Sequence, residues 1–274
     1  MKKQCRTIIF SRNRALQANL LLTSLFRHCN DILDVSDVYI LHRNDPEHEE
    51  SYKTLMSEFP QVNFVAETNF KNDLLALVHE SDISWCFFLV DDTIFTKNFT
   101  LTEIIGNMTY NIGDTLGFSL RLSPKTNYCF PYNCFQEIPK YEKVSGGVLK
   151  YNWQNAEYDF AYPLELSSSL YNKNDVLEIL EDCEYNSPNY LETRLAECHV
   201  SNKPNLLMFE KGVAFSTPLN LVQRSHPNRN AQHDPDTFRL LYEKGMRIDA
   251  GQFDGYMNRG CHEIPDKINF VRKE

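Results

Sequence analysis

Residues 84–95 read S-W-C-F-F-L-V-D-D-T-I-F, an apolar and aromatic run that ends in two adjacent carboxylates, Asp91 and Asp92. A short run of this kind is typical of a strand that is buried on both faces of a parallel sheet. The two carboxylates do not belong to its core, because burying a carboxylate without a partner costs too much free energy. Open α/β sheets bind ligands just beyond the carboxyl ends of their strands. The run therefore predicts a central strand with a ligand site at its end, and an acidic turn without a ligand is the alternative.

Strand and helix patterns alternate ahead of this run. Short apolar runs at residues 7–10, 38–41 and 62–66 predict three strands, each followed by a polar turn and a segment with helical character. This alternation is typical of an α/β fold in which crossover helices connect the strands of a parallel sheet. The pattern changes after residue 100. We therefore expect a single domain with two halves, residues 1–122 and 123–274.

The composition argues against several classes of partner. The chain of 274 residues has 28 basic and 37 acidic side chains, a formal net charge of −9. Nucleic acids and anionic membranes bind basic surfaces, so neither is expected as a main partner. No segment has the length of a membrane span, and the first ten residues lack the apolar core of a signal peptide. The eight cysteines form no C-x-x-C pair, which favours reduced thiols, and we expect a cytoplasmic location.

A polar turn follows the first predicted strand. Ser11, Arg12, Asn13 and Arg14 precede a helical pattern, which places backbone N–H groups and two guanidinium groups at a helix N-terminus. Such a terminus is a natural anion site, and two solvated arginines are the alternative. The chain contains neither G-x-G-x-x-G nor G-x-x-x-x-G-K-[ST], which argues against the usual dinucleotide and P-loop sites. Since the chain is acidic, the Asp pair is best explained by a cation, Mg²⁺ or Mn²⁺, that carries phosphate oxygens.

The order of these features resembles the GT-A fold of nucleotide-sugar glycosyltransferases, especially its family-2-like and exostosin-like branches. The similarity covers most of residues 5–200. It implies a Rossmann-type, mostly parallel central sheet flanked by helices, with a nucleotide-sugar-binding half (1–122) and an acceptor-side half with a C-terminal tail (123–274). The motifs that carry it are F-S-R-N-R at 10–14, N-F-K-N-D at 69–73, F-F-L-V-D-D-T at 87–93 and E-L-S-S-S-L-Y at 165–171.

The resemblance implies a nucleotide-sugar donor, most of all a UDP-sugar, that binds with the help of Mn²⁺ or Mg²⁺. It places Ser11, Arg12 and Asn13 at the uracil or ribose, and Lys71 and Asp73 near the nucleotide. The acceptor is a carbohydrate or another hydroxyl compound.

The resemblance also assigns the metal. Aligned with an exostosin-like D-D-D-T, Asp91 and Asp92 take the second and third carboxylate positions, and Val90 replaces the first. This makes Asp92 the direct metal ligand and Asp91 a neighbour of the nucleotide. A histidine from the C-terminal segment completes such sites, for which His226 is preferred over His262 because arginines surround it in the sequence.

Catalysis requires a carboxylate on the acceptor side, and two candidates are present. Glu165 lies in E-L-S-S-S-L-Y, where strand alternation would turn it toward the cleft together with Ser167 and Ser169. Glu192 lies one turn into a predicted helix, where an exposed acid favoured by the helix dipole is the alternative. Two aromatic residues, Trp153 and Tyr162, are candidates for stacking on a sugar or for core packing.

Two other interpretations compete with a transferase. An apolar strand that ends in Asp also occurs in phosphatases of the haloacid-dehalogenase type, but their D-x-D-x-T lies near the N-terminus and Thr93 stands at the place of the second acid. The incomplete D-x-D also suits a non-catalytic GT-A-like domain that holds a nucleotide sugar or carbohydrate without transferring it.

Overall fold

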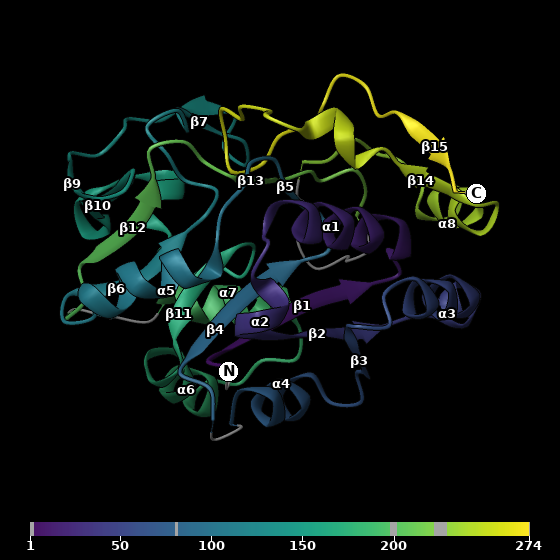
Figure 1. Ribbon diagram of the computed structural model, residues 1–274, viewed down its shortest axis with the longest axis horizontal. Coiled ribbons are helices and arrows are strands. Elements are labelled where there is room, and N and C mark those ends of the chain that lie inside the picture. The colour runs from purple at the N-terminus through teal and green to yellow at the C-terminus, as the bar shows by residue number, and fades with distance from the viewer. Residues whose placement is uncertain (1–2, 80–81, 198–201, 222–228, 274) are drawn as a thin grey trace.

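The predicted strands before residue 95 form one half of a central sheet (Figure 1). This computed structural model describes residues 3–79, 82–197, 202–221 and 229–273. Neighbouring strands in this half are parallel, and β1 lies between β2 and β4. The strands, in the order of the sheet, are β3 (Asn63–Ala66), β2 (Ser36–Arg43), β1 (Cys5–Arg12) and β4 (Trp85–Val90).

The second half of the sheet extends from β4 and mixes strand directions. β11 (Ser169–Asn172) pairs antiparallel with both β4 and β6 (Thr115–Ser119). β12 (Asn205–Phe209) then runs parallel to β6, and β10 (Val148–Asn152) runs antiparallel to both β12 and β9 (Tyr141–Ser145). Within the described part of the chain, β11 and β10 are thus the strands of this sheet that oppose the others, which confirms the expected mostly parallel α/β sheet.

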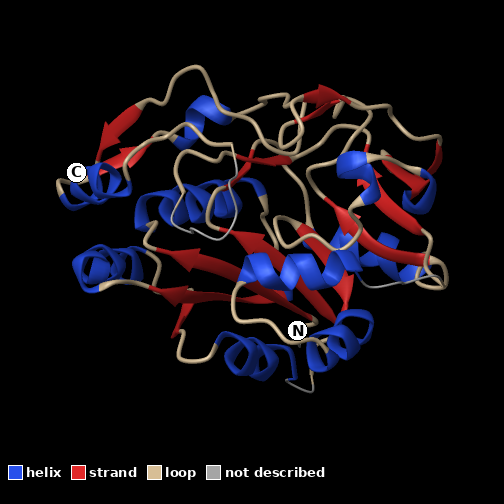
Figure 2. Ribbon diagram, turned by 180° about the vertical axis from the view of Figure 1, so that it is seen from behind, coloured by secondary structure: helices blue, strands red, loops and turns tan. Residues whose placement is uncertain are grey.

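Helices cover both faces of the sheet (Figures 1 and 2). Alternate residues of β1 explain this: Cys5 and Ile9 face one apolar layer, and Ile8 and Phe10 face the other. Helices α1 (Ala15–His28), α3 (Glu49–Glu58), α5 (Leu101–Tyr110) and α8 (Pro235–Glu243) contribute to the first layer. Helices α4 (Phe70–His79), α6 (Lys173–Asp182) and α7 (Pro188–Glu197) contribute to the second.

Shorter elements complete the chain. They are α2 (Ile32–Val35) and the 3-10 turns η1 (Pro46–His48), η2 (Trp153–Asn155), η3 (Tyr158–Ala161) and η4 (Ala250–Phe253). Three antiparallel pairs also lie outside the main sheet: β5 (Thr93–Phe95) with β13 (Ala214–Ser216), β7 (Tyr128–Cys129) with β8 (Cys134–Phe135), and β14 (Met246–Ile248) with β15 (Phe270–Arg272).

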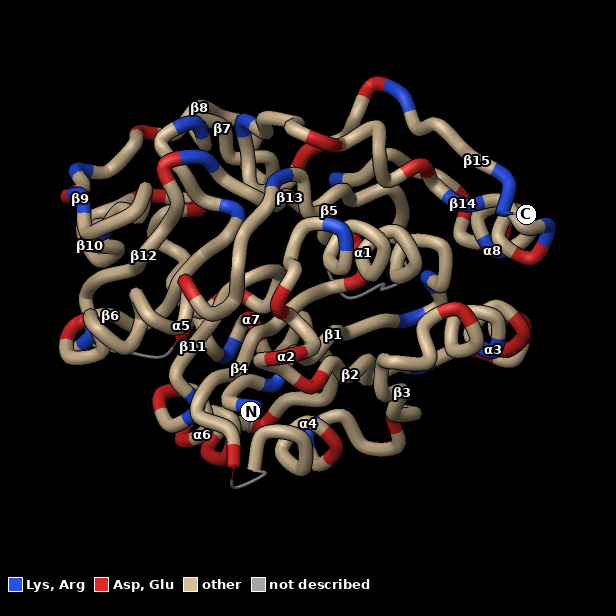
Figure 3. The backbone as a smooth tube through the Cα atoms, in the orientation of Figure 1, with Lys and Arg blue, Asp and Glu red and all other residues tan. Residues whose placement is uncertain are grey.

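The charged side chains are distributed unevenly. Outer helices such as α3 and α6 carry many of the acidic residues (Figure 3). Among the described residues, no helix combines the length and apolarity that crossing a membrane requires.

The structure corrects the predicted strand through Glu165. β11 begins only at Ser169, and the residues before it form an irregular loop. Ser168 has a φ of 147°, which interrupts the extended backbone. The alternation that would place Glu165, Ser167 and Ser169 on one strand face is therefore wrong, because only the last of them belongs to a strand.

Candidate functional site

A cleft of about 1110 Å³ opens at the carboxyl ends of β1 and β4, where the sheet topology predicts it. Sites for single ligands usually measure roughly 300–1,000 Å³, so this cleft lies just above the upper end of that range. The chain contributes to it from both halves. Lining residues come from segments 10–14, 41–43, 67–70, 90–92, 119–122, 129–132, 158–167, 186–192, 218–221, 229 and 261–262.

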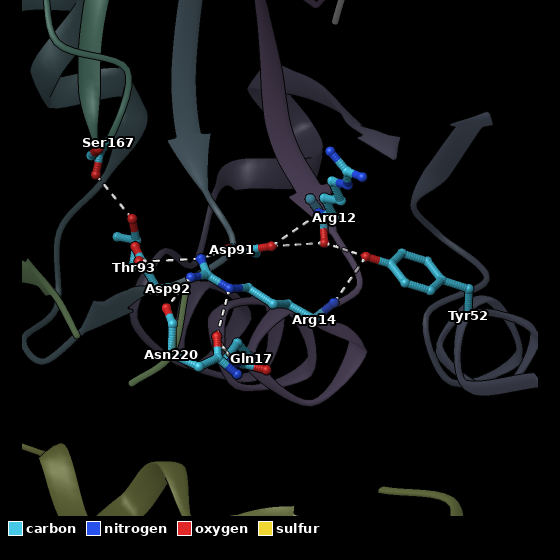
Figure 4. A network of polar contacts seen from close by, with 10 residues as sticks. Arg12, Arg14, Gln17, Tyr52, Asp91, Asp92, Thr93, Ser167 and Asn220 are labelled. Atoms are coloured by element: carbon cyan, nitrogen blue, oxygen red, sulfur yellow. Dashed lines mark hydrogen bonds and ion pairs between the residues drawn. The ribbon is translucent and has the colours of Figure 1, made fainter. Parts of the chain in front are cut away.

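Asp91 connects the end of β4 to the turn after β1 (Figure 4). Its Oδ2 accepts hydrogen bonds from Ser11 Oγ (3.0 Å) and from the backbone N–H of Arg12 (3.2 Å). Its Oδ1 accepts from Arg14 Nη1 at 3.0 Å. Burial raises the pKa of Asp91, and the ion pair with Arg14 opposes that shift. Since both oxygens already have donors from this chain, Asp91 does not fit the role of a metal ligand.

Asp92 is the more open carboxylate of the pair. Its side chain is 16% exposed, against 5% for Asp91, and it lines the cleft. Arg14 Nη1 lies 3.5 Å from its Oδ2. Burial raises the pKa of Asp92 to about 6, and the charge of Asp91 adds to the shift. A carboxylate oxygen here is accessible to a cation, and the role of Asp92 as a metal ligand stays a prediction.

Arg14 is a fixed positive charge beneath the two carboxylates. Its Nε donates to Asn220 Oδ1 at 2.8 Å, and its Nη2 donates to the backbone carbonyl of Asn220. Gln17 Nε2 donates to the same Asn220 Oδ1 at 3.1 Å. Asn220 Nδ2 is buried without a hydrogen-bond partner among the described residues. The guanidinium is therefore held in place by a segment 206 residues further along the chain.

The other residues of the polar turn divide between the scaffold and the cleft. Tyr52 places its hydroxyl 2.6 Å from Ser11 Oγ. Asn13, with φ 54°, donates from Nδ2 to Asp45 Oδ2 at 2.7 Å and accepts from the Asp45 N–H at 2.8 Å. Asn13 thus closes a loop rather than lining the cleft. Arg12 is exposed and lines the cleft, so its guanidinium is available to an anion.

The structure does not bring Lys71 and Asp73 into the cleft. Lys71 Nζ lies 3.0 Å from Glu184 Oε1 and donates to the Glu181 carbonyl at 3.1 Å, which links α4 to α6. Asp73 accepts from the backbone N–H of Thr68 at 2.7 Å and caps the start of α4. The partners of Lys71 lie more than 100 residues further along the chain, whereas the cap by Asp73 is a local contact.

The histidines leave the metal prediction open. His226 lies outside the described residues. His262 lines the cleft with its Nε2 3.3 Å from Arg121 Nη1, and burial together with that guanidinium lowers its pKa to about 3. Within the described ranges, no group of three or more histidine, cysteine, aspartate or glutamate side chains is arranged to hold a metal ion.

Glu165 lines the cleft, but both of its carboxylate oxygens already accept hydrogen bonds from this chain. It is 5% exposed, and Arg121 Nη2 donates to its Oε2 at 2.7 Å. The Ser167 N–H donates to the same oxygen, and the Ser169 hydroxyl donates to Oε1. These contacts make Glu165 an anchor for Arg121 rather than a carboxylate ready to accept a proton.

Glu192 on α7 is the better placed of the two candidate acids. It lines the cleft, is half-buried, and accepts one hydrogen bond at Oε1 from the Leu166 N–H (3.0 Å). Burial raises the pKa of Glu192 to about 7, and the charge of Glu165 adds to the shift. A carboxyl group with a pKa near 7 in a cleft is typical of a general base that works at neutral pH.

Sequence analysis overlooked Arg121. It is 5% exposed and donates from Nη1 to Ser216 Oγ at 3.2 Å, and its Nε is buried without a partner among the described residues. A signal was present, because an arginine interrupts the otherwise apolar F-S-L-R-L at 118–122. Of the two predicted aromatic residues, Tyr162 lines the cleft, and Trp153 donates from Nε1 to the Lys203 carbonyl at 2.9 Å outside it.

Comparison with known proteins confirms the resemblance to a glycosyltransferase. No protein-family model matches the chain. The bifunctional glycosyltransferase pgtA of Dictyostelium discoideum is 29% identical over 191 residues, which is 64% of this chain and 25% of pgtA. The chain thus matches about a quarter of the length of that curated relative.

Three solved structures are partly similar to the chain. S. aureus TarS 1–349 in complex with UDP-GlcNAc has a TM-score of 0.49 and 9% identity, covering 82% of this chain and 60% of that one. The 4-diphosphocytidyl-2C-methyl-D-erythritol synthase of Anaerococcus prevotii has a TM-score of 0.41 and 9% identity, covering 78% and 92%. The bifunctional glycosyltransferase WbbM has a TM-score of 0.38 and 12% identity, covering 71% and 38%.

Proposed function

We propose that the chain is a glycosyltransferase that moves a sugar from a nucleotide-diphosphate donor, a UDP-sugar, to a hydroxyl acceptor. The observation that carries the proposal is Glu192, a carboxyl group with a pKa of about 7 in the same cleft as the Asp91–Asp92 pair. Similarity to pgtA supports the class of reaction. The donor nucleotide follows from the resemblance of the strand-end motifs.

The donor side uses residues from β1 and β4. Arg12 is exposed in the cleft and is suited to pair with a diphosphate oxygen. Arg14 lies deeper and balances the charge of the two carboxylates. Asp92 would hold Mn²⁺ or Mg²⁺, which when bound supplies positive charge that stabilises the departing nucleoside diphosphate. A metal requirement is part of this proposal.

The acceptor side uses Glu192. Its carboxylate removes the proton of the acceptor hydroxyl as the oxygen forms a bond to the anomeric carbon of the donor sugar. The bond between that carbon and the phosphate oxygen breaks, and the electron pair leaves with UDP. Arg121 is held by Glu165, and its buried Nε has no partner among the described residues. Its positive charge interacts with the carboxylates of Glu165 and Glu192. We assign to Glu165 the positioning of this guanidinium.

UDP release from a panel of UDP-sugars, measured with and without MnCl₂, tests the proposal. We expect release from at least one donor, and we expect Glu192→Gln to lower its rate by roughly 10²–10⁴-fold, the usual effect of losing a general base. Glu197→Gln is the matched control, because Glu197 is an exposed acid on the same helix that pairs with Arg194.

The outcomes separate the competing functions. UDP that stabilises the protein while no donor releases UDP would identify a binding domain instead of a transferase. Full activity in Glu192→Gln would remove that residue from the mechanism. A protein that UDP does not stabilise at all, with or without MnCl₂, would contradict the proposed donor.

A further inference from the structure

Three exposed tyrosine rings line the cleft and take no part in the donor site or the proposed base. Tyr132 is 71% exposed, Tyr158 is 41% exposed and Tyr190 is 45% exposed, and all three line the cleft. They come from the β7–β8 turn, from η3 and from the start of α7. All three segments belong to the half of the chain that follows the donor-binding half. Large aromatic side chains are usually buried, so exposed rings gathered at a cleft are candidates for ligand contact.

The first ring stands on a fixed turn. The Asn133 N–H donates to the Phe130 carbonyl at 3.2 Å, and Tyr128 donates from its hydroxyl to Asn133 Oδ1 at 2.6 Å. Arg229 Nη1 also donates to the Phe130 carbonyl at 2.6 Å, and its guanidinium stacks 4.4 Å from the centre of the Phe130 ring. Tyr132 therefore projects from a turn whose neighbours are tied down.

The second ring is presented at a conformational cost. Tyr158 has a φ of 51°, a left-handed conformation that is rare for a bulky side chain. The next residue is held by Gln136, whose Oε1 accepts from the Asp159 N–H at 3.1 Å. This backbone brings the Tyr158 ring to 5.4 Å from that of Tyr132, with the planes tilted by 55°. Strained residues that persist in a fold often serve a site.

The surroundings of the rings are polar, which selects the kind of ligand. Asp159, Arg229 and Glu192 line the same cleft. Each of them already has a hydrogen-bond partner within the chain, and a lipid chain would offer them no further polar contact. A sugar ring has apolar C–H faces that can lie against tyrosine rings and hydroxyl groups that can bond to carboxylates and guanidinium groups. Tyrosine itself combines an apolar body with a polar tip.

We propose that Tyr132 and Tyr158 form a subsite for a pyranose ring of an oligosaccharide acceptor, in the cleft that Tyr190 also lines. This inference rests on the proposed function and gives the acceptor a chemical class. The cleft volume of about 1110 Å³ agrees with it, because a donor alone would leave part of that space unfilled. In this proposal the tyrosines bind the acceptor and take no part in proton transfer.

Saturation-transfer NMR on the full chain with saturating UDP tests the subsite, with lactose, maltotriose, chitotriose and mannotriose as probes. We expect at least one probe to receive saturation at its ring C–H protons. The double variant Tyr132→Ser/Tyr158→Ser should bind that probe about tenfold more weakly, since each aromatic contact contributes a modest amount. Its affinity for UDP, measured by calorimetry, should stay unchanged.

Phe135→Ser is the matched control, because Phe135 is 72% exposed on the same hairpin and does not line the cleft. Equal weakening by the control and by the double variant would overturn the inference. So would the absence of binding by all four sugars to a protein that binds UDP, or competition for the cleft by decyl phosphate, a lipid-like probe. Failure of UDP binding itself would instead overturn the proposed function.

Discussion

Two buried arginine–carboxylate clusters differ in how fully their charges are compensated. In the first, Glu58 of α3 receives Asn19 Nδ2 at 2.6 Å, Arg247 Nε at 3.2 Å and Lys273 Nζ at 3.2 Å. Arg247 also donates to the Tyr242 carbonyl at 2.9 Å. Burial acts to raise the pKa of Glu58, but the hydrogen bonds and charges of Arg247 and Lys273 together outweigh it, and the pKa is lowered. This cluster joins α3 to the C-terminal segment.

The second cluster, at the cleft, has the opposite balance. Arg14 serves both Asp91 and Asp92, and burial raises the pKa of both carboxyl groups. Asn220, which holds Arg14, keeps a buried Nδ2 without a partner among the described residues. Buried charge by itself therefore does not identify a ligand-binding site. A cleft whose charges are incompletely compensated is a better candidate, because a ligand can supply the missing opposite charge.

The compensated cluster should matter most for stability. Arg247→Ala leaves a buried carboxylate without its main partner, so we expect a loss of about 3 kcal/mol in the free energy of unfolding. Urea unfolding measures this. Arg239→Ala, which removes ion pairs along the outside of α8, should cost less than about 1 kcal/mol. Similar losses in the two variants would mean that the buried pair of Arg247 and Glu58 contributes no more than an exposed ion pair.

The pH dependence of turnover tests the uncompensated acid on α7. Glu192 must be deprotonated to act as a base, and its pKa is about 7. The value of kcat/KM should therefore rise about tenfold per pH unit below that value and level off above it. Between pH 5 and pH 7 the rise should be about 50-fold, because half of the Glu192 carboxyl groups are still protonated at a pH equal to their pKa. A flat profile in the wild type, with a similar profile in Glu192→Gln, would contradict the assignment.

Asp92→Asn should have an effect on stability opposite in sign to that of Arg247→Ala. The folded-state pKa of Asp92 is raised to about 6, so its charge destabilises the fold as pH rises from about 4 through 6. We expect the Asn variant to gain about 1–2 kcal/mol relative to wild type at pH 8, with the gain disappearing at pH 4. Unfolding curves at both pH values provide the check, and a loss at pH 8 would mean that Arg14 fully compensates this carboxylate.

The smallest expected effect concerns Ser168, in the irregular loop that precedes β11. Ser168 has a φ of 147° and a buried hydroxyl without a partner among the described residues. Ser168→Gly should therefore stabilise the protein by about 1 kcal/mol. Ser167→Gly, at a position without positive φ, is the control and should destabilise by roughly 0.5–1 kcal/mol. Thermal unfolding that ranks the two variants in the reverse order would contradict the claim that the backbone at Ser168 is strained.

The first half of the chain was predictable because its signals are local. Apolar runs and polar turns identified β1, β2, β3 and β4, and parallel topology then placed Arg12 and Asp92 at one edge of the sheet. The tail was harder, since α8 is short, although Asp234 followed by Pro235 is a typical helix start that sequence analysis overlooked.

Distant contacts account for what the sequence did not reveal. The role of Arg14 depends on Asn220, far along the chain, and Glu165 depends on Arg121, which lies on another segment. The resemblance to the GT-A fold placed Lys71 near the nucleotide, but the packing of α4 against α6 directs it to Glu184. Such pairings are set by tertiary packing, which local patterns do not encode.

Calorimetric titration of UDP is the most direct test of the claim that the uncompensated cluster is the donor site. We predict that wild-type protein binds UDP, that Arg12→Ala binds it at least about tenfold more weakly because a charge-assisted bond is lost, and that Glu58→Gln binds it like the wild type at a temperature where it is folded. Equal weakening by the two variants, or unchanged binding by Arg12→Ala, would contradict the account.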